Sequence, residues 1–172
     1  MIKPFSYFFK KLFEEVPWRL MQGALGLIAF MGLQYILGPL TTFVSEPGQI
    51  VLVVIIAAAA FLLSFTFKMI LGISALWITD YHGLQQLMNV VILAFAGYIL
   101  PIELYPEFLQ RISYLLPFAY VIYYPIVALQ GHLTTVLLLR VLLIQALWIG
   151  LFAVVYRYLW KKGIRKFAAV GQ

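Results

Sequence analysis

Residues 49–78 of the chain read QIVLVVIIAAAAFLLSFTFKMILGISALWI, and Lys68 is the single charged side chain among them. A helix of this length extends about 45 Å, whereas the hydrocarbon core of a bilayer is about 30 Å thick. The stretch can therefore cross a membrane and must tilt or protrude from it. It predicts an integral membrane protein whose solvent is largely lipid.

The composition of the whole chain agrees with that prediction. Apolar residues make up 65% and charged residues 10% of the 172 positions, whereas soluble domains carry about 25% charged residues. The net charge of +6 comes from basic residues near the chain ends rather than from a stripe with interleaved aromatics, so nucleic acid is not an expected partner. The absence of cysteine excludes disulfides, thiolate metal sites and cysteine nucleophiles.

The apolar stretches predict one transmembrane domain over residues 1–172, an all-α bundle with four transmembrane helices. A short N-terminal segment precedes the spans, and a basic cytoplasmic tail follows them. The spans are expected at 20–37, 49–78, 84–100 and 133–159, after an amphipathic segment over 1–18 and before the tail over 160–172.

The N-terminal segment has two faces when it is drawn as a helix. Aromatic and aliphatic side chains recur at helical spacing on one face, and charged side chains occupy the other, which is typical of a helix lying in the membrane interface. The same pattern also suits a helix whose apolar face docks on a soluble partner. The residues concerned are Phe5, Phe8, Phe9 and Phe13 on the apolar face and Lys10, Lys11, Glu14 and Glu15 on the charged face.

Residues 101–132 are apolar but repeatedly interrupted by proline, which predicts two helices too short to span. We expect an extracytoplasmic re-entrant hairpin, because basic clusters flank the first and last spans and the positive-inside rule places both chain ends in the cytoplasm. An even number of spans satisfies that rule. The residues that shape the hairpin are Gly97, Pro101, Pro106, Pro117 and Pro125.

No enzyme site can be assembled from the titratable residues. The six carboxylates and two histidines are scattered, and no phosphate-binding loop of the G-x-x-x-x-G-K-[ST] type occurs. We therefore expect no catalytic residue, no metal site and no directly bound cofactor.

Four residues are candidates for a transport pathway. Lys68 and Arg140 are cations within predicted spans. Lys68 either faces a pathway or reaches the interface along its own stem. Arg140 either joins an ion-pair network that gates the outer exit or is solvated at the interface, and the other members of that network would be Glu103, Glu107 and Arg111. Tyr120 and Tyr123 belong to a dense aromatic group that either lines a path for an amphipathic substrate or forms an interfacial belt.

Several short motifs, in order along most of the chain, carry a family resemblance. They are Lys3-Pro4 through Trp18-Arg19, Gly97 to Pro101 with Tyr105-Pro106, Leu116-Pro117-Phe118, Pro125, Gly131, Gln145, Trp148, Gly163 to Phe167 and Val170-Gly171. The chain resembles the permease subunits of type-2 ATP-binding-cassette (ABC) exporters, in particular a bacterial branch linked to drug, polysaccharide and peptide export. Family members usually have six spans, and this sequence lacks counterparts of the first two helices.

The resemblance implies a permease subunit that forms part of a translocation pathway in the bacterial cell (inner) membrane. It implies an ABC ATPase subunit and a second permease subunit as partners, with ATP bound by the ATPase, and it places a coupling helix at residues 4–18. The alternative function is a non-transporting membrane scaffold or assembly subunit.

Overall fold

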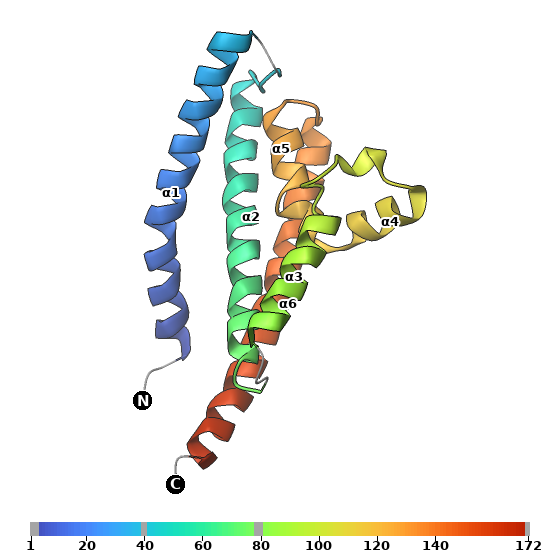
Figure 1. Ribbon diagram of the computed structural model, residues 1–172. Helices are drawn as coiled ribbons and strands as arrows, with labels where there is room; N and C mark the ends of the chain where they lie inside the picture. The colour runs from blue at the N-terminus through green and yellow to red at the C-terminus, as the bar shows by residue number, and fades with distance from the viewer. Residues whose placement is uncertain (1–3, 39–40, 78–80, 171–172) are drawn as a thin grey trace. The chain divides into compact units, whose positions relative to one another are not determined.

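The computed structural model describes residues 4–38, 41–77 and 81–170, and these ranges are helical apart from short connections (Figure 1). No β-strand occurs among the described residues, so the predicted all-helical class is confirmed. The chain divides into two units, residues 1–42 and residues 43–172, each of which is described by itself.

The first unit consists of one long helix, α1 (Pro4–Leu37). The sequence predicts an interfacial helix and a separate span here, whereas the structure runs both together with Pro17 inside the helix. A proline removes one backbone hydrogen bond, but the helix continues on both sides of it. Residues Tyr7–Leu37 are long and apolar enough to cross a membrane.

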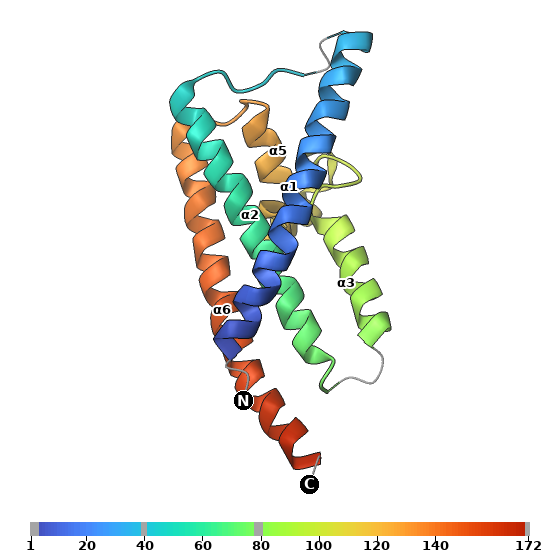
Figure 2. The ribbon, with the colours of Figure 1, turned by 90° about the vertical axis from the view of Figure 1, so that its left-hand side faces the viewer.

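The second unit is built on two helices that run in parallel, α2 (Pro47–Ser74) and α6 (Thr135–Val170) (Figures 1 and 2). Near their first residues, Gln49 Nε2 donates a hydrogen bond to Thr135 Oγ1 at 3.5 Å. Toward their other ends, Gly163 of α6 lies against Leu76 so closely that an added Cβ would be 2.5 Å from its Cδ1. The two contacts show that both helices begin at the same end of the unit.

The core of the second unit is formed where α2 and α6 meet the connecting segment between residues 101 and 132. Ile56, Leu63 and Leu138 are almost completely buried there. Ile102 and Ala119 of the connecting segment belong to the same cluster. This shared core fixes the segment against the helix pair.

Helix α3 (Tyr81–Phe95) corrects the third predicted span. The sequence predicts an end at Leu100, but the helix stops at Phe95 because Gly97 adopts a φ of 71° and Pro101 follows soon after. At 15 residues it is about 22 Å long, shorter than the hydrocarbon core. The described helices that can span are thus Tyr7–Leu37, Pro47–Ser74 and Thr135–Gly163, or four if a bent pair after α3 counts as one span.

The segment after α3 contains the two short helices that the sequence predicts, α4 (Glu107–Leu115) and α5 (Tyr123–Leu129). Two single turns of 3₁₀-helix accompany them, η1 (Ile102–Leu104) and η2 (Pro117–Tyr120). The axis bends by 69° between α4 and the η2–α5 part. We call residues 101–132 the hairpin segment.

Helix α6 extends beyond its predicted end. The sequence predicts a basic tail from residue 160, whereas α6 continues to Val170. Lysine and arginine are good helix formers, so a basic composition does not end a helix. Lys162 illustrates the continuity, since its Nζ lies 4.6 Å from the ring centroid of Tyr158, one turn earlier.

Gly131 gives a test of the hairpin segment. It adopts a φ of 77°, and a Cβ there would lie 3.3 Å from the backbone of Val44. We expect Gly131→Ala to destabilise the protein by about 1–3 kcal/mol, through left-handed strain and this contact. The readout is the unfolding midpoint in a titration of the detergent-solubilised protein with sodium dodecyl sulfate. Gly150→Ala is the control, because open space surrounds this helical glycine and alanine favours the helix there; equal midpoints for both variants would contradict the prediction.

Candidate functional site

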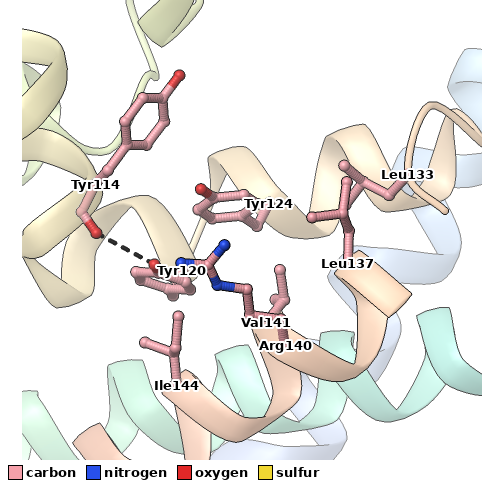
Figure 3. Close-up of a pocket in the computed structure, with 8 residues that line it drawn as sticks. All are labelled: Tyr114, Tyr120, Tyr124, Leu133, Leu137, Arg140, Val141 and Ile144. Atoms are coloured by element: carbon pink, nitrogen blue, oxygen red, sulfur yellow. Dashed lines mark hydrogen bonds between the residues drawn. The ribbon is translucent and has the colours of Figure 1, made fainter. Parts of the chain in front are cut away.

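A cavity of ≈ 380 Å³ lies between α6 and the hairpin segment (Figure 3). We call it the arginine–tyrosine cavity. Apolar side chains, one cation and three tyrosines form its wall, a composition suited to binding. The lining residues are Tyr114, Tyr120, Tyr124, Leu133, Leu137, Arg140, Val141 and Ile144.

One wall of the cavity is a single stripe of α6. Leu137, Arg140, Val141 and Ile144 line the cavity together because residues three and four positions apart share a helix face. From Leu137 to Ile144 the stripe extends about 10 Å along the helix. Arg140 is the only charge on it, so a cation stands within an otherwise apolar strip.

The opposite wall is aromatic and comes from three different elements: Tyr114 lies in the last turn of α4, Tyr120 ends η2, and Tyr124 lies in α5. The rings of Tyr120 and Tyr124 stack with centroids 4.7 Å apart. The Tyr120 hydroxyl donates a hydrogen bond to the backbone oxygen of Tyr114 at 3.1 Å. These contacts hold the tyrosines in one rigid wall although a break separates α4 from α5.

The guanidinium of Arg140 points from α6 toward the rings of Tyr120 and Tyr124 (Figure 3). Arg140 is exposed, and among the described residues no carboxylate forms an ion pair with it. A cation at the edge of an apolar region requires water, an anion or a polar surface nearby. The site therefore has the electrostatics of a receptor for negative charge.

Gln145 of α6 positions the part of the aromatic wall that contains Tyr120. Its side chain is completely buried, and Nε2 donates to the backbone oxygen of Tyr120 at 2.9 Å and to that of Ile56 at 3.2 Å. One amide thus joins α6, η2 and α2. Its Oε1 has no hydrogen-bond partner among the described residues.

Side-chain hydrogen bonds also stabilise the beginning of the hairpin segment. Gln110 Nε2 donates to the backbone oxygens of Glu103 at 2.9 Å and Tyr105 at 2.8 Å. The Tyr123 hydroxyl donates a hydrogen bond to the Glu103 carboxylate. Tyr123 also contacts Tyr124 edge to face, with centroids 5.2 Å apart. Tyr123 therefore belongs to this network of contacts beside the cavity.

The structure brings together two of the four predicted pathway residues. Arg140 and Tyr120 line one cavity, Tyr123 adjoins it, and Lys68 does not line it. Sequence reasoning missed the bridging role of Gln145, although an amide between Ile144 and Ala146 in a long apolar helix was an available signal. It also missed the stripe of α6, which the spacing of residues 137, 140, 141 and 144 could have revealed.

The predicted coupling residues lie in the first turns of α1. Phe9 contacts Phe8 edge to face with centroids 5.8 Å apart, and it lies 6.5 Å from Phe13 on its other side. Phe13 is 71% exposed, so it presents a large apolar surface. Phe5 lies in the first turn of the same helix, and its side chain lies outside the described ones.

The charged residues of this segment pair with one another along the helix. Lys11 Nζ lies 2.7 Å from Glu14, and Arg19 lies 3.1 Å from Glu15. Water screens such exposed pairs, so their role in stability is small. Lys10 is exposed next to them. The segment thus has adjoining aromatic and charged surfaces.

No group of three or more histidine, cysteine or acidic side chains able to hold a metal ion occurs in the described part of the chain. The arginine–tyrosine cavity likewise has no carboxylate or histidine in its lining. Its residues can bind a ligand, orient it and exclude water from it.

Three described helices long and apolar enough to span define an integral membrane protein. A family model described as "ABC-2 family transporter protein" matches residues 1–171. The chain belongs to the ABC-2 transporter family, as a membrane permease component. The comparisons with curated proteins and with solved structures gave no match.

The amide of Gln145 provides a test of how the aromatic wall is held. Gln145→Met keeps a similar volume but removes both hydrogen bonds, and we expect a destabilisation of about 1–2 kcal/mol. Gln49→Met is the matched control, because it removes one exposed hydrogen bond of 3.5 Å and should cost less than about 0.5 kcal/mol. Denaturation with sodium dodecyl sulfate measures both, and a control that costs as much as Gln145→Met would refute the assignment.

Proposed function

We propose that the chain is the permease subunit of an ATP-driven exporter and that residues 4–18 couple it to a separate ATPase subunit. Membership of the ABC-2 transporter family supports the transport role. Export as the direction follows from the resemblance to the exporter branch. A second permease subunit, identical or different, completes the pathway, and ATP binds to the ATPase, because this sequence has no phosphate-binding loop.

The observation that carries the coupling role is the continuity of α1. Its 34 residues extend about 51 Å, which exceeds the hydrocarbon core by about 20 Å. The apolar residues 20–37 account for the part within the core, so the excess corresponds to the segment with Phe8, Phe9 and the charged residues. A continuous helix transmits a push at its exposed end to its membrane part without an intervening loop.

The exposed end of α1 suits a groove on a soluble partner. Phe8, Phe9 and Phe13 form a chain of ring contacts that can bury apolar area against that partner. The charges of Lys11 and Glu14 lie beside them and can set orientation. Movements of the ATPase would then shift α1 and change the interface between permease helices.

A pull-down tests the coupling. Tagged chain is purified in mild detergent from its native membrane, and co-eluting proteins are identified. We expect an ABC ATPase to co-elute with the wild type and to be reduced at least tenfold by Phe8→Asp or Phe9→Asp, because a buried carboxylate opposes docking.

Phe108→Asp is the control for the pull-down. Phe108 is 72% exposed on α4, and α4 belongs to the segment proposed to face away from the cytoplasm. Retention of the ATPase in this variant alone supports docking through α1. Absence of an ATPase from every sample favours the scaffold function instead.

We further propose that both chain ends are cytoplasmic and that the hairpin segment faces the other side of a bacterial cell membrane. The chain has no cysteine, so single-cysteine variants can be read without background. We expect a membrane-impermeant maleimide to label Glu107→Cys in intact cells or spheroplasts and to label Lys161→Cys only after permeabilisation. Both native side chains are exposed. Labelling of both variants in intact cells would exclude this topology.

A further inference from the structure

The arginine–tyrosine cavity has a charged part and an apolar part, and each suits a different part of one ligand. Arg140 places a permanent positive charge in the wall, and it has no carboxylate partner among the described residues. A guanidinium presents a planar fork of donors that matches a phosphate or carboxylate group. The charged part of a ligand should therefore be a single anionic head.

The rest of the lining is apolar and continues from the arginine in both directions along α6. Leu137 lies one turn before Arg140, and Ile144 lies one turn after it. Leu133 extends the apolar lining beyond Leu137. A free inorganic anion would leave this surface unused, whereas a hydrocarbon chain attached to the anion would cover it.

The tyrosine wall limits the shape of such a ligand. Tyr120 and Tyr124 stack on each other, so their rings form a firm surface opposite the α6 stripe. The volume of ≈ 380 Å³ is near the lower end of the range for small-molecule sites, about 300–1,000 Å³. It accommodates a head group with the first part of a chain, and a longer chain would leave along the apolar surface.

We propose that the arginine–tyrosine cavity binds the anionic head group of an amphiphile, a phosphate or carboxylate attached to a hydrocarbon chain. Arg140 pairs with the anion, Leu137, Val141 and Ile144 contact the chain, and Tyr120 and Tyr124 form the opposite wall. The amphiphile comes either from the bilayer or from the aqueous phase. The inference is independent of ATPase coupling, because binding is a property of the chain alone.

The experiment is native mass spectrometry of the purified chain released from detergent micelles, titrated with 18:1 lysophosphatidate. Uncharged monoolein is the matched amphiphile without the anion, and inorganic phosphate is the anion without the chain. We expect lysophosphatidate to bind at least tenfold more tightly than monoolein and inorganic phosphate to displace it poorly. Equal binding of monoolein, or full displacement by inorganic phosphate at the same concentration, would overturn the proposal.

Substitutions in the lining test whether lysophosphatidate binds in this cavity. Arg140→Gln should lower the affinity for lysophosphatidate at least tenfold, and Arg140→Lys, which keeps the charge without the fork, should lie between Arg140→Gln and the wild type. Leu137→Trp fills the cavity at an exposed position while keeping Arg140, and it should also weaken binding at least tenfold. Wild-type affinity in Arg140→Gln would refute the assignment.

Arg111→Gln is the control for general surface charge. Arg111 is 82% exposed on α4 and lies 3.6 Å from Glu107, outside the cavity lining. It should leave the affinity unchanged, and a loss equal to that of Arg140→Gln would show a nonspecific charge effect. Circular dichroism and gel filtration confirm that each variant is folded.

Lipid extraction of the purified protein distinguishes the source of the ligand. An anionic phospholipid that co-purifies with the wild type and is lost in Arg140→Gln assigns the site to the bilayer. Binding of added lysophosphatidate without any co-purified lipid assigns it to an amphiphile from the aqueous phase.

Discussion

A buried side-chain amide without hydrogen bonds costs about 1–3 kcal/mol in a protein, and the Gln145 side chain of α6 is fully buried. Its Nε2 offsets part of that cost by donating hydrogen bonds to backbone oxygens of η2 and α2. The geometry of the hairpin segment depends on this bridge, because η2 is a single turn with little internal structure to hold it. The bridge holds the backbone of Tyr120 in place. The ring of Tyr124 is positioned in turn, because it stacks on the ring of Tyr120.

The hairpin segment is irregular because its sequence cannot form a long helix. Its prolines remove backbone donors, and Pro117 follows the end of α4, whereas α5 ends just before Gly131 with its positive φ. Other groups must satisfy the freed carbonyls. Gln110 does this for the oxygens of Glu103 and Tyr105. Ile102 and Ala119 are completely buried against the rest of the second unit, which replaces the stability that short helices lack. The result is a rigid surface beside α6 built from weak local elements.

Much of this fold could be predicted from residues alone, because long apolar runs and proline positions are local signals. The helical class, the α2 and α6 helices and the two short helices of the hairpin segment all follow from them. Helix ends were less predictable: Gly97 ended α3 early, and Pro17 did not interrupt α1. The cavity was harder still, since its walls come from residues 114–124 and 133–144. Only tertiary packing sets the distance between those walls.

Lys68 and Arg140 show why that last step needs the structure. Lys68 is the single charge in α2, and Arg140 is the single charge in residues 135–156 of α6. The sequence gives no reason to rank one above the other. Lys68 lies within two turns of the end of α2, and Arg140 lies within two turns of the start of α6. Because α2 and α6 run in parallel, the two charges lie near opposite ends of the helix pair, where each stem can reach a membrane surface. The position near a helix end therefore lowers the desolvation cost of both charges. What the structure adds at Arg140 is the wall of tyrosines on the other side of the cavity, which together with the α6 stripe encloses the guanidinium.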